Sequence, residues 1–210
     1  MAAFLGNLRN VTIASFVLAL LLVGLYGYVQ GFDGPTFELF TLRWLHVVCG
    51  VMWIGLLWYF NFVSTPTMPK IPDELKPALG RFITPAALWW FRWGAMGTIF
   101  FGIVLAFRSN YLIEAYTLDL SQGMAGYPVV PKYLAIGIGM WLGTIMWFNV
   151  WFIIWPNQQK ALNIANRYPD LPADQKAKAG RMAMLTSRVN TMLSIPMLFC
   201  MAAATHILTG

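Results

Sequence analysis

Hydrophobic positions fall into five long stretches, separated by short segments that hold most of the charged residues. The stretches cover residues 12–29, 41–64, 86–107, 132–155 and 185–208. A transmembrane helix needs about 20 predominantly apolar residues, so each stretch predicts one membrane-spanning helix. The pattern therefore predicts an all-α, polytopic integral membrane bundle of about five helices, forming a single domain over residues 1–210.

The composition supports the membrane class. Hydrophobic residues make up 59% of the chain and charged residues 10%, whereas a soluble domain carries about 25% charged residues. The net charge of +6 does not indicate a nucleic-acid partner, because lysine and arginine in a membrane protein mainly report topology. The first expected partner is the lipid bilayer.

Basic residues cluster in two of the connections and at the N-terminus, and they predict the orientation. The connection after residue 64 and the connection after residue 155 are rich in lysine and arginine, whereas the other two connections hold few. This bias places the N-terminus in the cytoplasm and the C-terminus outside. We therefore expect a multi-pass protein of the bacterial inner (cytoplasmic) membrane.

The chain has only two histidines, and both lie inside apolar stretches. An ionisable residue at membrane depth indicates a functional site unless it has a structural partner. His46 follows the start of the second stretch and His206 precedes the end of the fifth, which places both at similar depth in the outer leaflet. Gly50, Ala202 and Ala203 lie one turn away and leave room for a planar macrocycle. Paired histidines are typical axial ligands of the iron of a b-type haem in a helical bundle, so we expect haem b between His46 and His206.

Other uses of the two histidines stay open. A membrane histidine can simply hydrogen-bond a hydroxyl or a carbonyl on a facing helix. Zinc is poorly supported because no carboxylate or thiolate accompanies the pair. Copper could draw on Met52, Met197 or Met201, although methionine in an apolar helix is usually a packing residue.

A second group of polar residues lies toward the predicted cytoplasmic side, and its members come from four of the stretches. They are Asn61, Arg92, Asn149, Arg188 and Asn190. The arginines could bind a planar anion or a haem propionate, and the asparagines could hydrogen-bond a substrate. Alternatively, the arginines extend to the membrane interface and the asparagines bridge helices.

Glycines on two stretches predict close approach between helices. Gly94, Gly97 and Gly102 lie on the third stretch, and Gly139 and Gly143 are four residues apart on the fourth. They indicate packing within the chain or, alternatively, a face for a homo-oligomer.

Four runs resemble the membrane domain of the bacterial cytochrome c-linked urate oxidase (urate hydroxylase) family. They are LRWLHVVCGVMWIGLLWYFNFV at 42–63, ALWWFRWGA at 87–95, NVWFIIWPNQQKAL at 149–162 and RVNTMLSIPMLFCM at 188–201. The H-x-x-x-G-x-x-W-x-G pattern from His46 to Gly55 is also similar to patterns in copper-resistance-D-like proteins and in haem-dependent membrane protoporphyrinogen oxidases. It adds Trp53 to the expected haem pocket.

The resemblance implies a redox protein that passes electrons from urate oxidation to cytochrome c. Longer family members carry a cytochrome c domain after the membrane part, but this sequence has no CxxCH motif for attaching a c-type haem. We therefore expect a separate cytochrome c as acceptor, and no catalytic residue is identified. The alternative is a non-catalytic structural or electron-relay subunit of a larger respiratory or photosynthetic membrane complex. A copper or small-solute permease is a third possibility.

Overall fold

The computed structural model describes residues 2–31, 33–120, 124 and 130–208, and these residues form helices and short connections without a β-strand. Contacts divide the chain into two compact units, Met1–Thr41 and Leu42–Gly210. The first unit contains α1 (Ala2–Leu5), α2 (Leu8–Gln30) and the beginning of α3 (Gly34–Trp58). Within its unit, α2 buries only Gly27.

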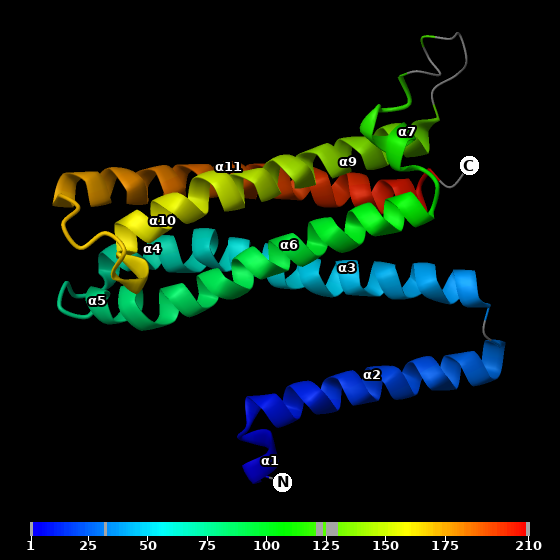
Figure 1. Cartoon of the computed structure of the whole chain (residues 1–210), viewed down its shortest axis with the longest axis horizontal. Coiled ribbons are helices and arrows are strands. Elements are labelled where there is room, and N and C mark those ends of the chain that lie inside the picture. Colours follow the sequence, from blue (N-terminus) through cyan, green and yellow to red (C-terminus); the bar gives the residue numbers. More distant parts are fainter. Residues whose placement is uncertain (1, 32, 121–123, 125–129, 209–210) are drawn as a thin grey trace. The chain divides into compact units, whose positions relative to one another are not determined.

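The second unit is an antiparallel helical bundle, coloured from light blue to red in Figure 1. Its long helices are α3, α6 (Thr84–Arg108), α9 (Pro131–Phe148) and α11 (Ala173–His206), and α9 lies beside α11. Shorter helical elements are η1 (Tyr59–Ser64), α4 (Thr65–Thr67), η2 (Met68–Lys70), α5 (Lys76–Ala78), η3 (Leu79–Ile83), α7 (Leu112–Tyr116), η4 (Asn149–Ile154), α10 (Trp155–Leu162) and η5 (Ile164–Asn166).

Five continuous helices in the described residues are long and apolar enough to span a membrane, which confirms the predicted helical class. They are Leu8–Gln30, Gly34–Lys70, Lys76–Arg108, Pro131–Leu162 and Ala173–His206. Four of them extend well beyond the predicted apolar stretches, because polar residues continue the helix past its hydrophobic part. The predicted orientation across the membrane stays a prediction.

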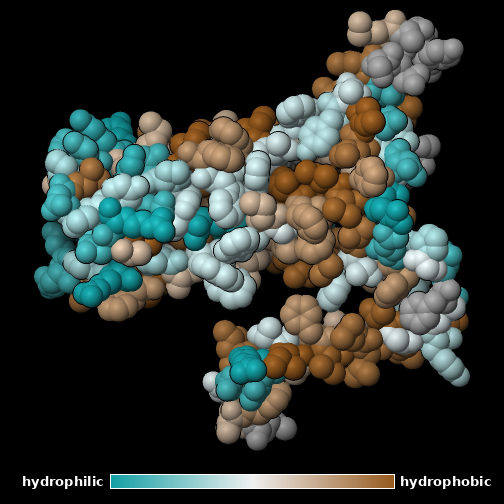
Figure 2. Space-filling model, viewed as in Figure 1, coloured by the Kyte–Doolittle hydropathy of each residue, from teal (hydrophilic) through white to brown (hydrophobic). Residues whose placement is uncertain are grey.

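Two ends of the second unit carry different residues. The histidine end comprises residues 42–52, 98–108, 131–140 and 198–206, and the basic end comprises residues 59–70, 76–87, 155–162 and 173–182. These two sets of residues lie at opposite ends of the bundle (Figure 1). Each set combines the start of some helices with the end of others, because α3 and α11 run antiparallel. On the face shown in Figure 2, hydrophilic side chains gather over the basic end and hydrophobic ones over the middle of the bundle.

Three of the long helices contain a π-helical segment, and a proline explains each one. Pro66, Pro85 and Pro156 follow η1, η3 and η4 by two residues. A proline ring inside a helix clashes with the carbonyl four residues before it, and here that carbonyl falls within the π-helical segment. The wider turn avoids the clash, and its hydrogen bonds reach back five residues, as from Thr65 N–H to Phe60 O and from Trp155 N–H to Val150 O. The helices therefore continue through their prolines.

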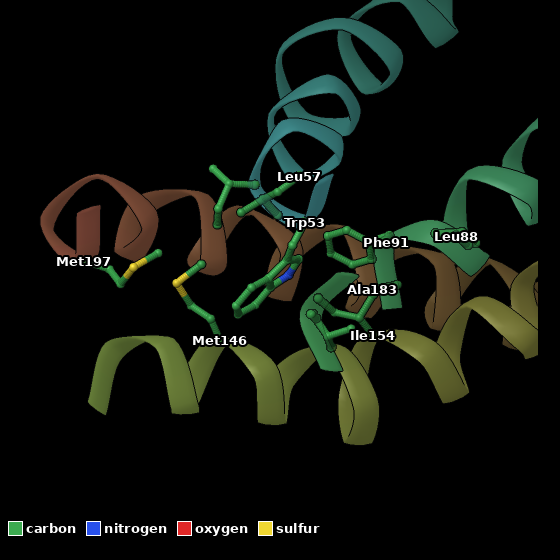
Figure 3. Close-up of a cluster of buried hydrophobic side chains, with 11 residues drawn as sticks. Trp53, Leu57, Leu88, Phe91, Met146, Ile154, Ala183 and Met197 are labelled. Carbon is green, nitrogen blue, oxygen red and sulfur yellow. The ribbon is translucent and has the colours of Figure 1, made fainter. Parts of the chain in front are cut away.

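A core of large buried side chains joins four helices between the two ends (Figure 3). We call it the large-residue core: Trp53, Ile54, Leu57, Leu88, Phe91, Ala95, Met146, Val150, Ile154, Ala183 and Met197. Trp53 is 1% exposed, and in Figure 3 its indole lies between the α9 and α11 ribbons, near Met146. One tryptophan from α3 thus fills the space at which the other helices converge.

The glycines let helices of the same chain approach closely. A Cβ at Gly94 would lie 3.2 Å from Trp53 N, and one at Gly97 would lie 2.6 Å from Cys49 Sγ. A Cβ at Gly139 would lie 3.1 Å from Cys200 Cβ on α11. These positions confirm intramolecular packing, whereas a Cβ at Gly143 would meet nothing within 4 Å.

Candidate functional site

His46 lies against α6 at the histidine end. Its Nδ1 donates a hydrogen bond to the backbone carbonyl of Thr98, at 2.8 Å. The imidazole lies against Gly102, where a Cβ would be only 2.8 Å from His46 Cε1. The imidazole ring therefore fits against α6 because Gly102 has no side chain, and the hydrogen bond to the Thr98 carbonyl fixes the orientation of the ring.

This hydrogen bond determines which nitrogen of His46 can bind a metal. A carbonyl oxygen only accepts, so Nδ1 carries the proton and the lone pair of the neutral ring lies on Nε2. Within the described part of the chain, Nε2 has no hydrogen-bond partner. Metal-binding histidines commonly donate their other ring N–H to a carbonyl in this way.

His206 is the last residue of α11 and is exposed. Ala202 is also exposed, whereas Ala203 is buried. Because α3 and α11 are antiparallel, His206 and His46 belong to the same end of the bundle (Figure 1).

The other predicted pocket residues have clear surroundings. A Cβ at Gly50 would make ordinary contact with the Thr98 side chain at 3.9 Å, and Trp53 belongs to the large-residue core. Trp53 thus lies about two turns deeper than His46 along α3. Along α3, Trp53 is therefore the residue at which the histidine end meets the large-residue core.

Few metal-ligating side chains gather at the histidine end. Among the described residues, no group of three or more His, Cys, Asp or Glu side chains could hold a metal ion. A haem needs only axial ligands from the protein because its ring supplies the other four. The oriented His46 ring, with Nε2 unbonded, meets that need.

Two of the predicted polar residues form a buried hydrogen-bonded pair. Asn149 Nδ2 donates to Asn190 Oδ1 at 2.8 Å, and Asn190 Nδ2 donates to the backbone carbonyl of Met146 at 2.9 Å. Asn190 is 0% exposed. These bonds join α11 to the junction of α9 and η4.

Asn61 binds a different residue of α11. Its Nδ2 donates to Ser187 Oγ at 2.8 Å, and Trp58 Nε1 donates to Ser194 Oγ at 3.0 Å. Ser187, Asn190 and Ser194 thus form a polar seam along α11, which holds both neighbouring helices. Both serines and Trp58 were not among the predicted residues, although the i, i+3, i+7 spacing of Ser187, Asn190 and Ser194 is a signal that could have identified the serines.

The structure gives the two predicted arginines different surroundings. The guanidinium of Arg92 lies over Trp155, 3.3 Å from the ring centroid, and 5.7 Å from the ring of Trp151. Such cation–π contacts stabilise a partly buried charge. Arg188 is exposed on α11. Arg92 therefore lies in an aromatic setting, whereas Arg188 faces the surroundings of the chain.

An unused hydrogen-bond donor lies beside Arg92. The indole N–H of Trp151 is buried and has no acceptor within the described residues. Buried polar groups are normally paired, so an unpaired one calls for an explanation. Trp53 and Trp147 also have buried indole N–H groups without an acceptor among the described residues, and the Trp151 ring is the one that lies within 5.7 Å of the Arg92 guanidinium.

Comparison with protein-family models relates the chain to a known family over part of its length. The model described as urate oxidase N-terminal matches residues 131–209. The matched part holds α9 to α11, with Asn149, Asn190, Arg188 and His206, whereas His46 and Arg92 lie before it. No match to the chain is found among curated proteins or among solved structures.

Proposed function

We propose that this protein lies in the bacterial cytoplasmic membrane and passes electrons from urate oxidation, through a haem b, towards a cytochrome c. The match of residues 131–209 to the urate oxidase N-terminal family carries the proposal. Five helices of membrane length support the location. The unbonded Nε2 of His46 supports the cofactor.

His46 and His206 would hold the haem iron from α3 and α11. When bound, the haem supplies one-electron redox chemistry. The hydrogen bond to the Thr98 carbonyl keeps the proton on His46 Nδ1, so the Nε2 lone pair would be available to the iron, and Gly102 provides the space for the ring. The small residue Ala203 lets α11 approach the edge of a planar group.

Urate would bind near Arg92 as an anion. The guanidinium would attract its charge, and the Trp151 N–H would donate a hydrogen bond. Asn61, Asn149 and Asn190 already use amide N–H groups within the bundle, and Asn190 Oδ1 accepts from Asn149. On this proposal Asn190 positions helices, while Asn61 and Asn149 offer side-chain carbonyl oxygens to ring N–H groups of urate. Exposed Arg188 would guide the anion inward.

Electron counting sets the acceptor stoichiometry. Hydroxylation of urate takes its oxygen from water and releases two electrons and two protons. Cytochrome c accepts one electron at a time, so two acceptor molecules would be reduced for each urate. The water-derived oxygen makes molecular oxygen unnecessary for this reaction.

A reduced-minus-oxidised visible spectrum of the purified protein tests the cofactor. We expect the Soret and α bands of a b-type haem in the wild type and their loss in His46→Ala and His206→Ala, with partial recovery in added imidazole. Helical circular dichroism serves as the folding control. Unchanged bands in both folded variants would exclude the paired ligation.

Urate then tests the electron donor. We expect anaerobic urate to reduce the haem in the wild type, and Arg92→Gln to slow this reduction while leaving the dithionite-reduced spectrum unchanged. A haem that dithionite reduces and urate does not would contradict the urate assignment while leaving the cofactor intact.

A second candidate is a non-catalytic structural or electron-relay subunit of a larger membrane complex. The asparagine N–H groups are used in helix-to-helix hydrogen bonds, and this favours the second candidate. Purification in mild detergent distinguishes the two, since a subunit should elute with partner chains at fixed ratio. An isolated chain or a homo-oligomer that oxidises urate would exclude this candidate.

A further inference from the structure

A groove with a volume of about 400 Å³ lies between α10 and α11 at the basic end. Polar, charged and apolar side chains all contribute to its lining. The lining residues are Asn157, Lys160, Leu171, Gln175, Lys178, Ala179 and Met182. The groove is thus amphipathic, and two lysines from different helices converge on it.

The charge balance of the groove favours an anion. Lys160 is exposed and forms no ion pair with another described residue. Lys178 lies 3.6 Å from Asp174, but the two side chains are 81% and 67% exposed, so water screens the pair. The Asn157 amide N–H is used by the carbonyl of Ile153, at 2.8 Å. Within the described part of the chain, Asp174 is thus the one carboxylate that forms an ion pair with either of the two lysines.

An exposed apolar stripe continues from the groove along α11. Met182, Leu185, Val189 and Met192 are each between 42% and 66% exposed. At 100° per residue they lie on the same face of the helix as Lys178. The groove thus opens at one end onto a hydrophobic track that runs into the membrane-length part of α11.

We propose that this groove binds the phosphate head group of an anionic phospholipid, with one acyl chain along the α11 stripe. The phosphate would contact Lys160 and Lys178, and Gln175 would donate an amide hydrogen bond. The position suits a lipid because the lysines end an apolar helix span, where head groups lie in a bilayer. The proposal uses the membrane location proposed above and does not depend on the haem or on urate.

The test follows the thermal unfolding midpoint of the full chain in uncharged detergent, by intrinsic tryptophan fluorescence. Phosphatidylglycerol, phosphatidylcholine with the same acyl chains, and inorganic phosphate are titrated separately. We expect phosphatidylglycerol to raise the midpoint saturably, because a ligand that binds only the folded state stabilises it. Phosphatidylcholine and inorganic phosphate should have little effect.

The double variant Lys160→Gln/Lys178→Gln should need roughly 30-fold more phosphatidylglycerol for half of the effect, since each lysine near an anionic surface contributes several-fold in affinity. The control Lys70→Gln/Lys176→Gln removes the same charge outside the groove lining and should titrate like the wild type. Met192→Gln should weaken the lipid effect without altering any response to phosphate. If both double variants needed the same concentration of phosphatidylglycerol for half of the effect, the proposed site would be wrong. If inorganic phosphate raised the unfolding midpoint as much as phosphatidylglycerol does, the ligand would be free phosphate and not a lipid.

Discussion

The large-residue core and the histidine end are built from the same helices, yet they differ in the size of their buried side chains. In the core, Trp53, Leu57 and Phe91 are at most 1% exposed. At the histidine end, α3 has no buried residue over positions 42–52, all of which the structure describes. Apart from Leu105, the buried residues there are glycine, alanine and threonine.

On the proposed function, this difference separates a scaffold from a cofactor site. Close packing of large side chains fixes how four helices meet, and a cavity in such a core is costly. The histidine end relies instead on backbone proximity, as at Gly97 and Gly102, and leaves a nitrogen of His46 unbonded. A planar cofactor would supply the bulk that the chain itself does not provide there.

The largest effect should come from emptying the core. Trp53→Ala should lower the free energy of unfolding by roughly 3 kcal/mol, because the neighbouring helices cannot close the cavity fully. Denaturant titration in detergent measures the change. Trp90→Ala, at a position 53% exposed on α6, is the matched control and should change stability by less than about 1 kcal/mol. Equal losses would mean that the core is not the scaffold.

A smaller but more specific effect is expected at the histidine end. Gly102→Ala places a methyl group 2.8 Å from His46 Cε1, so the ring must leave the Thr98 carbonyl. Overpacking of this kind should cost about 2 kcal/mol, and haem retention should fall with it.

Gly55→Ala is the control for that variant, because a Cβ there meets nothing within 4 Å and the helix gains a better helix former. We expect unchanged or slightly higher stability and full haem retention. If Gly102→Ala behaved in the same way, the contact of His46 with α6 would not control the ligand.

The buried asparagine pair should contribute less to stability than the free energy lost in Trp53→Ala or in Gly102→Ala. Asn190→Leu leaves the Asn149 amide without its acceptor and should destabilise the protein by about 1 kcal/mol. Adding Asn149→Leu removes the unpaired group, so the double variant should lose less than the sum of the single losses. A double-mutant cycle measures the coupling, and strict additivity would indicate that the pair does not interact.

The smallest effect should come from the edge of the polar seam. Ser194→Ala removes the acceptor of the Trp58 indole and should cost about 0.6 kcal/mol, a typical value for an interhelical hydrogen bond in a membrane protein. Trp58→Phe removes the donor of the same bond. In the Ser194→Ala background this second change should cost less than it does alone, and a thermal unfolding series would detect the difference.

The sequence predicted the helices well because hydrophobic length alone identifies them. It also predicted the glycine contacts, since Gly94 and Gly97 have few other uses in an apolar helix. The helices extend up to a dozen residues beyond the predicted apolar stretches, as at Ala173, where polar residues lengthen α11. Hydrophobicity does not report where a helix continues in water.

The polar residues were harder to predict. Helical spacing shows which residues share one face of a helix, but it does not show what packs against that face. Asn190 and Arg188 are two residues apart, yet one is buried against Asn149 and the other is exposed. Ser187 and Ser194 were not predicted because serine is common in helices. Their role becomes visible only in the structure, where Asn61 and Trp58 donate hydrogen bonds to them. Pairing across helices is a tertiary property, and a single sequence does not contain it directly.

The π-helical segments have a consequence for how the length of this chain can vary. A π turn closes with one residue more than an α turn. Deleting one residue within η1 or η4 would convert the segment to an α-helix and keep both flanks in register, provided that Pro66 or Pro156 is also replaced, because the proline ring would clash in the narrower turn. The same deletion at another position in α3 or α9 would rotate every following side chain by about 100° and break the pairing of Asn61 or Asn149 with α11. Single-residue gaps between homologous chains should therefore concentrate at residues 59–64 and 149–154, in chains that lack the proline which follows the segment.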